Sequence, residues 1–303
     1  MPLMINHVWF GNNAMGPLEK FNIYSWRALG HSVTIYACRW DNTSPVDTVG
    51  VKEKNVTVVN LRTLLNGDDE SKAAILTNTR ALLKAWLEAA GGAAPQGDGI
   101  YNLVDVTKSY IGGTQRGIVL DLKVGPSSHL SAYEAAFSTK FISYTRGGNT
   151  AGDMPENQCI GTMEQGNTLR GKYATSFEKG ITANLDGNDG LLAKPTAKWF
   201  DQITGYHGRA AFLACKYLDV ATKAPDGKAV GNQYEVQEIG PKSHGPFRIF
   251  KRASDQSNKS GLKTKPKEVK ELAQWVWDNE LKEGGGDQHF LKKVEKALQA
   301  LPG

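Results

Sequence analysis

Cysteine is scarce in this chain, and its spacing excludes the usual uses of clustered thiols. The 303 residues include three cysteines, Cys38, Cys159 and Cys215, which lie far apart. An odd number of isolated cysteines is typical neither of a disulfide framework nor of a zinc site. We therefore expect buried free thiols in a protein that works in a reducing compartment.

Long apolar runs are also missing. No stretch approaches the ~18 consecutive apolar residues that a membrane-spanning helix needs. The first residues, from Met1 to His7, lack the basic start and longer apolar region of a secretory signal peptide. These absences predict a cytoplasmic protein without a membrane span. The Gly-x-Ser-x-Gly motif of α/β hydrolases and the His-Glu-x-x-His motif of zinc proteases are absent as well.

Charge of either sign is modest, but the basic residues are unevenly distributed. The formal net charge of +5 permits an acidic ligand such as a nucleotide diphosphate and does not demand nucleic acid. Between Lys242 and Lys270, however, nine basic side chains stand against two acidic ones. This segment is either a solvated surface loop or a loop that faces phosphate groups or a polyanionic acceptor.

Alternating strand and helix patterns predict a mixed, mainly parallel α/β sheet flanked by helices. The predicted strands are Leu3–Phe10, Val33–Ala37, Val56–Leu61, Ile100–Val104 and Ile118–Leu122, and the clearest helices are Glu19–Leu29 and Ser71–Ala90. The C-terminal part predicts a helical lobe with a helix over Thr196–Val220, a helix that has Pro266 in its first turn and ends near Glu280, and a final helix over His289–Leu298. Two short strands, Gln233–Ile239 and Phe247–Lys251, are predicted between the first two of these helices. No linker divides the chain, so we expect one domain over residues 1–303.

Two acidic and two basic residues mark the candidate site. Asp105 and Lys108 are three apart, so we expect them to share one face at the start of a helix. The apolar run Ile118–Leu120 predicts a short buried strand that ends in Asp121, at the edge where open α/β sheets bind ligands. Lys123 follows two residues later, which would place it on the same strand face as Asp121.

The stretch from Asn102 to Ser127 resembles the core of the DXD-motif sugar transferases, the family that includes the glucosylating domains of the large clostridial toxins. In that family an Asp-x-x-Arg pair precedes a strand that ends in Asp-x-Asp. Asp105 and Asp121 match the first acid and the first DXD aspartate, whereas Lys108 replaces the arginine and Lys123 replaces the second aspartate.

Two further matches extend the resemblance over roughly residues 1–175. The start, Ile5-Asn6-His7-Val8-Trp9-Phe10-Gly11, is similar to the family's first strand, and Asn22-Ile-Tyr-Ser-Trp26 is similar to the helix that follows it. The segment from Glu156 to Arg170 is similar to a helix after the DXD strand. The resemblance implies a GT-A-like fold, with residues 1–175 as the donor half and 176–303 as the acceptor or lid half.

The resemblance also implies a nucleotide-sugar donor, most simply a UDP-sugar. It makes Trp9 a stacking platform for the base, with Phe10 beside it, and makes Asn157 a contact to the donor or leaving group. Asp105 and Lys108 would contact the sugar, and Asp121 would hold Mn²⁺ or Mg²⁺ between the phosphates. Because one carboxylate is a poor site for these ions, Lys123 is a candidate to neutralise the diphosphate directly.

Three functions stay open from the sequence. The first is a glycosyltransferase, metal-independent if Lys123 compensates the phosphate charge, with a protein, saccharide or DNA-base acceptor. The second is a catalytically silent nucleotide-sugar binding module, in which Asp121 and Lys123 form an ordinary ion pair. The third is a transferase acting on nucleic acid, which the basic segment motivates. The family includes toxins, so delivery into a host cytosol is a second expectation for location. The sugar, base, acceptor, stereochemistry and oligomeric state are not specified by these patterns.

Overall fold

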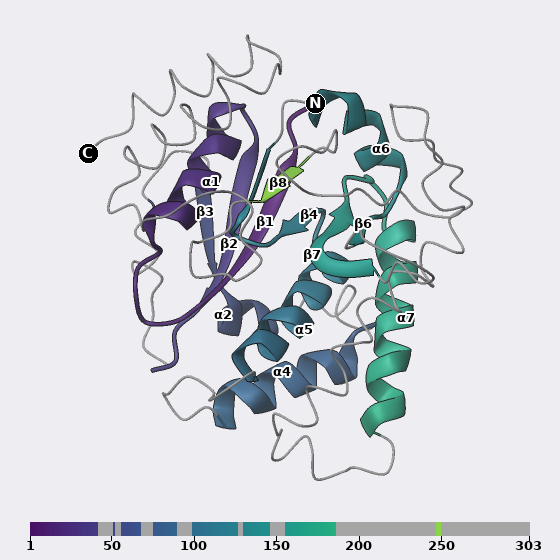
Figure 1. The fold of residues 1–303 in the computed structure, drawn as a ribbon. Helices are drawn as coiled ribbons and strands as arrows, with labels where there is room; N and C mark the ends of the chain where they lie inside the picture. Colours follow the sequence, from purple (N-terminus) through teal and green to yellow (C-terminus); the bar gives the residue numbers. More distant parts are fainter. Residues whose placement is uncertain are drawn as a thin grey trace.

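A six-stranded sheet runs through the middle of the computed structural model (Figure 1). The structure describes residues 1–41, 51, 56–67, 75–89, 99–126, 130–145, 155–185 and 247–249. In sheet order the strands are β3 (Val56–Asn60), β2 (Ser32–Cys38), β1 (Met4–Phe10), β4 (Gly117–Leu120), β7 (Pro155–Thr162) and β6 (Ile142–Thr145). The first four are parallel, whereas β7 runs antiparallel to both β4 and β6. The predicted mixed, mainly parallel sheet is confirmed.

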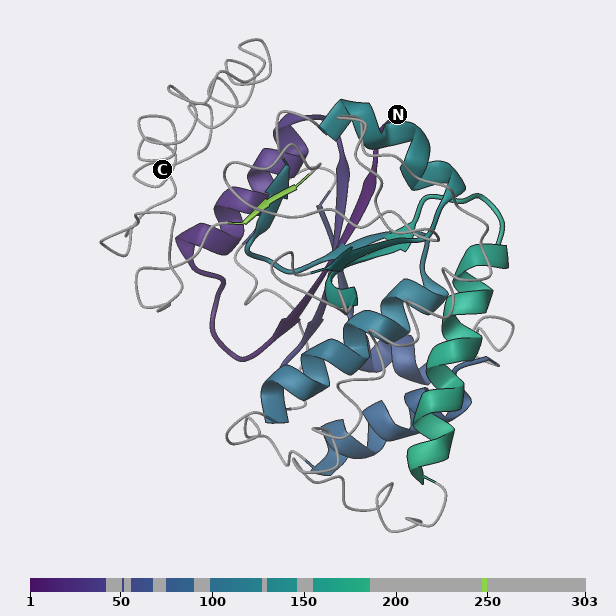
Figure 2. The same ribbon diagram turned by 45° about the vertical axis from the view of Figure 1, so that its right-hand side comes forward.

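Helices cover both faces of the sheet (Figure 2). One face carries α1 (Pro17–Ala28), the 3-10 turn η2 (Leu130–Tyr133) and α6 (Glu134–Thr139). The other carries α2 (Leu61–Asn66), α4 (Thr77–Ala89), α5 (Gly99–Thr114) and α7 (Thr168–Leu185). Two helical layers bury the inner strands from both sides, which explains their nearly continuous apolar sequences. Leu3 and Ile5 face α1, while Val8 and Phe10 face the layer of α5.

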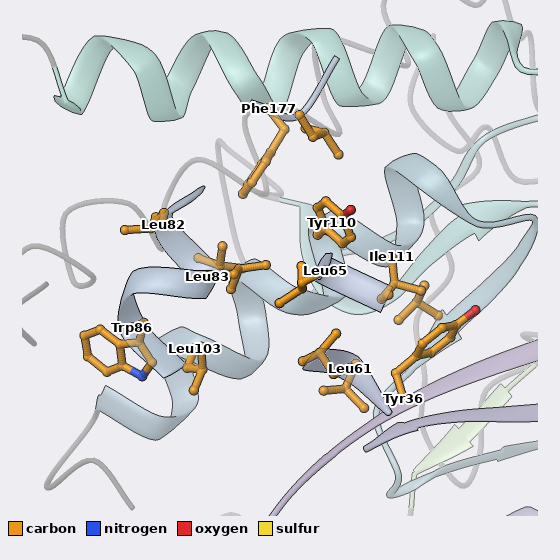
Figure 3. Packing of buried hydrophobic residues seen from close by; sticks show 14 of the residues in the cluster. Tyr36, Leu61, Leu65, Leu82, Leu83, Trp86, Leu103, Tyr110, Ile111 and Phe177 are labelled. Atoms are coloured by element: carbon orange, nitrogen blue, oxygen red, sulfur yellow. The ribbon is translucent and has the colours of Figure 1, made fainter. Parts of the chain in front are cut away.

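Each face of the sheet has its own hydrophobic core. The core between the sheet and α5 is the larger of the two and is rich in leucine and aromatic side chains. Figure 3 shows how α4, α5 and α7 meet there through Leu82, Leu83, Trp86, Leu103, Tyr110, Ile111 and Phe177. Within α5, a Cβ atom at Gly113 would lie 3.0 Å from Leu76 Cδ1 and 3.1 Å from Ala174 Cβ. The glycine pair at 112 and 113 therefore does not end the helix but lets neighbouring elements approach it closely.

Two sequence predictions of secondary structure are wrong. Ile100–Val104 is not a strand but part of α5, because a short apolar run fits a buried helix as well as a buried strand. Asp105 and Lys108 consequently lie in the middle of a helix and not at its start. The segment after Glu156, predicted to be a helix, begins as strand β7, and α7 starts only at Thr168.

The end of β4 also differs from the prediction by two residues. The strand was expected to reach Leu122 but stops at Leu120, so Asp121 begins a turn and Lys123 is not on the same strand face. After this turn, β5 (Val124–Pro126) pairs with β8 (Phe247–Ile249) in a second, two-stranded sheet. The predicted strand near Phe247 is thus confirmed over three residues.

Some of the remaining predictions fall outside the described residues, and others can be compared with the structure. Outside the described residues lie Cys215, the predicted strand Gln233–Ile239 and the predicted helices Thr196–Val220, Pro266–Glu280 and His289–Leu298. Cys38 and Cys159 are buried free thiols, as expected. Within the described residues, no helix is both long and apolar enough to cross a membrane.

Candidate functional site

The candidate site lies where the order of the strands along the chain reverses across the sheet. The chain passes from β1 outward to β2 and β3, then returns through α5 to β4 on the other side of β1. Ile5 pairs with Ile118 and Asn6 with Val119 in parallel register, so β1 and β4 end at the same edge. Such a reversal leaves a crevice at the carboxyl ends of the strands, the usual ligand position in open α/β sheets. Trp9 and Asp121 share this edge, as predicted.

Side chains from β1 and α1 hold the turn that follows β4. The Nδ1 atom of His7 is 2.8 Å from the carbonyl oxygen of Leu120. Asn22 donates from Nδ2 to the carbonyl of Leu122 at 2.8 Å, and Trp26 donates from Nε1 to the carbonyl of Val124 at 3.3 Å. Three main-chain carbonyls around Asp121 are therefore fixed by buried side chains, and this turn is built as a rigid element.

Asp121 is paired with two lysines from different elements. Its Oδ1 atom lies 2.5 Å from Lys108 Nζ, which reaches it from the middle of α5. Its Oδ2 atom lies 3.5 Å from Lys123 Nζ. Lys108 also contacts Asp105 Oδ1 at 3.2 Å. The four predicted residues thus form one chain of alternating charges, in the order Asp105, Lys108, Asp121, Lys123.

The four side chains differ sharply in exposure. The side chain of Lys108 is 4% exposed, those of Asp121 and Asp105 are 20% and 25% exposed, and that of Lys123 is 40% exposed. The formal charges of the cluster cancel, so it offers no excess negative charge to a metal ion. Lys123 is the member that is best placed to meet a ligand from solution.

The ionised forms of the two most buried members stabilise each other. Burial favours a higher pKa for Asp121, but the charges of Lys108 and then Lys123 outweigh it and lower the pKa below its ordinary value. Burial favours a lower pKa for Lys108, but the charges of Asp121 and Asp105 outweigh it and raise the pKa. Both groups are therefore charged near neutral pH.

His7 and Cys159 lie near this charge cluster but are held in their neutral forms. Burial lowers the pKa of His7 to about 4, although the Leu120 carbonyl and the charge of Asp121 act in the opposite direction. Burial, reinforced by the negative charge of Asp121, raises the pKa of Cys159 well above its ordinary value. A neutral imidazole and a protonated thiol are not an activated nucleophile pair, so the geometry offers no cysteine chemistry here.

The two aromatic residues at the end of β1 have different environments. Trp9 is partly buried against the α1 layer and donates from Nε1 to the carbonyl of Asn13 at 3.2 Å. Phe10 is 8% exposed and stacks on Trp40, with ring centroids 5.5 Å apart and an interplanar angle of 18°. Trp40 is held in turn by a hydrogen bond from its main-chain N–H to Asn12 Oδ1 at 3.0 Å. Trp9 is the aromatic side chain of this pair with surface still available to a ligand.

For Asn157 and the basic segment, the structure gives the position of the backbone. Asn157 lies near the start of β7, which pairs with β4. Of the basic segment between Lys242 and Lys270, residues 247–249 form β8, with Arg248 opposite Gly125. This pairing brings residues 247–249 to within a few residues of the Asp121 turn along β5.

Sequence patterns did not identify the residues that hold the Asp121 turn in place. They also contain one glycine and lysine spacing that is typical of a phosphate site but forms the start of a helix here. His7, Asn22 and Trp26 belong to the matched motifs, but their bonds to the Asp121 turn span about a hundred residues of sequence. The spacing of Gly166, Gly171 and Lys172 fits Gly-x-x-x-x-Gly-Lys. There α7 already begins at Thr168, and the N–H of Gly171 donates to the carbonyl of Asn167 at 2.7 Å. The residues between the two glycines are therefore mostly helical and do not form the open loop of a phosphate cradle.

No family model matches the chain, and no curated protein matches it. Among solved structures the chain is similar to one titled "PaToxG Glycosyltransferase", with 12% identical residues and a TM-score of 0.39. The similar part covers 72% of this chain and 76% of the other. Within the described residues, no group of three or more His, Cys, Asp or Glu side chains is placed to hold a metal ion.

Proposed function

We propose that the chain is a glycosyltransferase that binds a nucleotide-sugar donor at the carboxyl edge of β1 and β4 and needs no metal ion. The observation that carries this proposal is the parallel register of β1 and β4, which brings Trp9 and the Asp121 turn to one edge. A nucleotide fits a site with an aromatic face at one end and a positive charge at the other. A UDP-sugar is the donor that the matched motifs imply.

The charges of the site support a metal-independent reaction. Both oxygens of Asp121 face ammonium groups, at 2.5 Å and 3.5 Å, so this carboxylate is already compensated. Lys123 is the more exposed of the two lysines and takes the role of a point charge for the diphosphate. When the bond between the anomeric carbon and the diphosphate breaks, negative charge builds on the leaving group, and a fixed ammonium stabilises it. The acceptor nucleophile then bonds to the anomeric carbon, and its proton passes to a phosphate oxygen of the departing diphosphate.

The remaining roles follow from the matched motifs and, for Trp9, Phe10 and Lys108, from their contacts. Trp9 stacks on the base, while Phe10, packed on Trp40, supports the wall beside it. Asp105 accepts hydrogen bonds from sugar hydroxyls, and Asn157 contacts the donor or the leaving group. Lys108 is held between two carboxylates and orients them for the donor. Asp121 acts through Lys123 and not as a metal ligand.

One observation favours a second candidate, a binding module without catalysis. Asp121 is fully paired in the cluster, as an ion pair that only maintains the fold would be. Arg248, which belongs to the basic segment of the sequence and lies opposite Gly125 on β5, motivates a nucleic-acid acceptor as a further alternative. Binding to DNA would then fall steeply with salt in a filter-binding titration, because each neutralised phosphate releases counterions.

The experiment is a thermal-shift screen with nucleotide sugars, followed by donor turnover with and without EDTA. A ligand at ~100 times its Kd stabilises the folded protein by about 2.7 kcal/mol, which such a screen detects. We expect turnover of the bound donor that EDTA leaves largely unchanged. Lys123→Ala should reduce turnover at least tenfold, and Trp9→Ala should weaken donor binding at least tenfold, each about 1.4 kcal/mol.

The control is Lys179→Ala, which removes an exposed lysine from α7 and should leave donor binding and turnover unchanged. Donor binding without any turnover would favour the binding module. Activity that is lost in EDTA and recovered with Mn²⁺ or Mg²⁺ would contradict the metal-independent reaction. If no common nucleotide sugar stabilises the protein, the proposed function is wrong.

A further inference from the structure

The position of Lys108 is unusual for a lysine in the middle of a helix. Its side chain is 4% exposed, and its ammonium lies 3.2 Å from Asp105 Oδ1 and 2.5 Å from Asp121 Oδ1. Asp105 belongs to the same helix, whereas Asp121 follows β4. One buried nitrogen therefore connects two carboxylates from two elements, and it does so at the edge where the donor is proposed to bind.

A divalent cation would use the same oxygen atoms. Mg²⁺ takes oxygen ligands at about 2.0–2.1 Å and is commonly held by one or two carboxylates together with phosphate oxygens and water. The Lys108 nitrogen already contacts one oxygen of Asp105 and one of Asp121, so an ion placed between these carboxylates would collide with the ammonium. A positive charge at that point would also repel the ion.

The charge balance of the cluster also indicates that the Lys108 ammonium stands in for a cation. In the wild-type cluster, two carboxylates and two ammonium groups cancel formally. Without the Lys108 ammonium, the two carboxylates would share only Lys123, whose nitrogen is 3.5 Å from the far oxygen of Asp121. A partly buried pair of acids that has lost its central charge is stabilised by another cation.

We propose that Lys108 is a built-in cation that takes the place of a divalent metal ion between Asp105 and Asp121, so that removal of its ammonium opens a cation site. The role of this cation in donor binding rests on the proposed function. The exclusion of metal by Lys108 does not rest on it, because metal binding is measured without any sugar nucleotide. In this view Lys108 is a positioning residue that sets the spacing of the two acids, and Lys123 remains the charge that meets the phosphates.

The experiment is a Mn²⁺ titration followed by electron paramagnetic resonance of the free ion. Wild-type protein should show no Mn²⁺ binding at this site over the titrated range, whereas Lys108→Ala should bind one Mn²⁺ with an affinity at least tenfold above the upper limit set by wild type. Asp105→Asn added to Lys108→Ala should remove this gain. Lys123→Asp added to Lys108→Ala should tighten binding further, because it replaces a nearby positive charge with a third carboxylate. The matched control Lys179→Ala, an exposed lysine on α7, should behave like wild type.

A second variant guards against loss of folding. Lys108→Met keeps the apolar stem of the side chain without its charge, and circular dichroism with and without Mn²⁺ reports whether each variant folds. The proposal is overturned if folded Lys108→Ala and Lys108→Met bind Mn²⁺ no better than wild type. It is also overturned, whatever the variants do, if wild type binds Mn²⁺ at a site that Asp121→Asn abolishes.

The outcome separates this proposal from the proposed function. A gain of Mn²⁺ binding in Lys108→Ala with no nucleotide sugar bound by wild type would retain the built-in cation and reject the transferase. Donor turnover by wild type with no gain of Mn²⁺ binding in either Lys108 variant would retain the transferase and reject the built-in cation.

Discussion

The buried imidazole of His7 makes a definite prediction about stability and pH. His7 is fully buried, and its Nδ1 atom contacts the Leu120 carbonyl at 2.8 Å. Its Nε2 atom is buried and has no hydrogen-bond partner within the described part of the chain. Protonating this ring would place a charge in the core, and burial therefore lowers the pKa of His7 to about 4.

The sign and size of the effect follow from linkage. The ring has a pKa of 6.5 in the unfolded chain and about 4 in the folded protein, so the unfolded state binds the proton first as the pH falls. Folding stability is therefore lost as the pH drops from 6.5 towards 4. These two values correspond to a loss of about 2 kcal/mol between pH 7 and pH 5. Asp121, whose pKa is lowered, stays ionised over that range.

The perturbation is His7→Asn, whose side-chain amide can still donate to the Leu120 carbonyl but does not titrate. Urea unfolding of wild type and variant should be compared at several values between pH 5 and pH 7. We expect the variant to be less stable at pH 7, because the smaller side chain leaves a cavity. Its stability should nevertheless vary with pH by about 2 kcal/mol less than that of wild type. Equal pH dependence of the two proteins would refute the reasoning.

Two further predictions concern packing and helix capping. Gly161→Ala should cost about 2–4 kcal/mol of stability in urea unfolding, because its φ is +139° and a Cβ there would collide with the carbonyl oxygen of Gly117. Gly11→Ala is the matched control: its φ is +140° but nothing lies within 4 Å of the added Cβ, so a cost as large as that at Gly161 would disprove the collision. Glu178 accepts hydrogen bonds of 2.5 Å and 3.1 Å from the first main-chain N–H groups of α4. Glu178→Gln should therefore cost about 1–3 kcal/mol and speed hydrogen exchange in α4, whereas Glu88→Gln, exposed on the same helix, should do neither.

The predictions for Lys108 and His7 concern the same turn, which the two side chains contact from opposite sides of the sheet. Lys108 holds the side chain of Asp121 from the α5 layer, and His7 holds the neighbouring carbonyl from the α1 layer. The proposed donor site would need its charges fixed before the ligand arrives, because reorganising them would consume binding energy. The surrounding bonds from Asn22 and Trp26 serve the same purpose.

The sequence by itself determined the strands that carry the site and the residue types at their ends. The apolar runs of β1, β2, β3 and β4 are unambiguous because parallel strands covered on both faces need continuous apolar sequence. The matched motifs also selected Trp9, Asp105, Lys108, Asp121 and Lys123 in advance. The shared edge of Trp9 and Asp121 was predictable, since parallel strands in one sheet end on the same side.

The tertiary structure alone decided which of these charges meet. Sequence spacing suggested that Lys123 would be the partner of Asp121, yet Lys108 lies closer, at 2.5 Å against 3.5 Å. Periodicity could not show this, because it misassigned the start of α5 and therefore the direction from which Lys108 approaches. The contact between Lys108 and Asp121 depends on how α5 packs across the sheet. No local sequence pattern links residues on two different elements, so the sequence alone could not predict it.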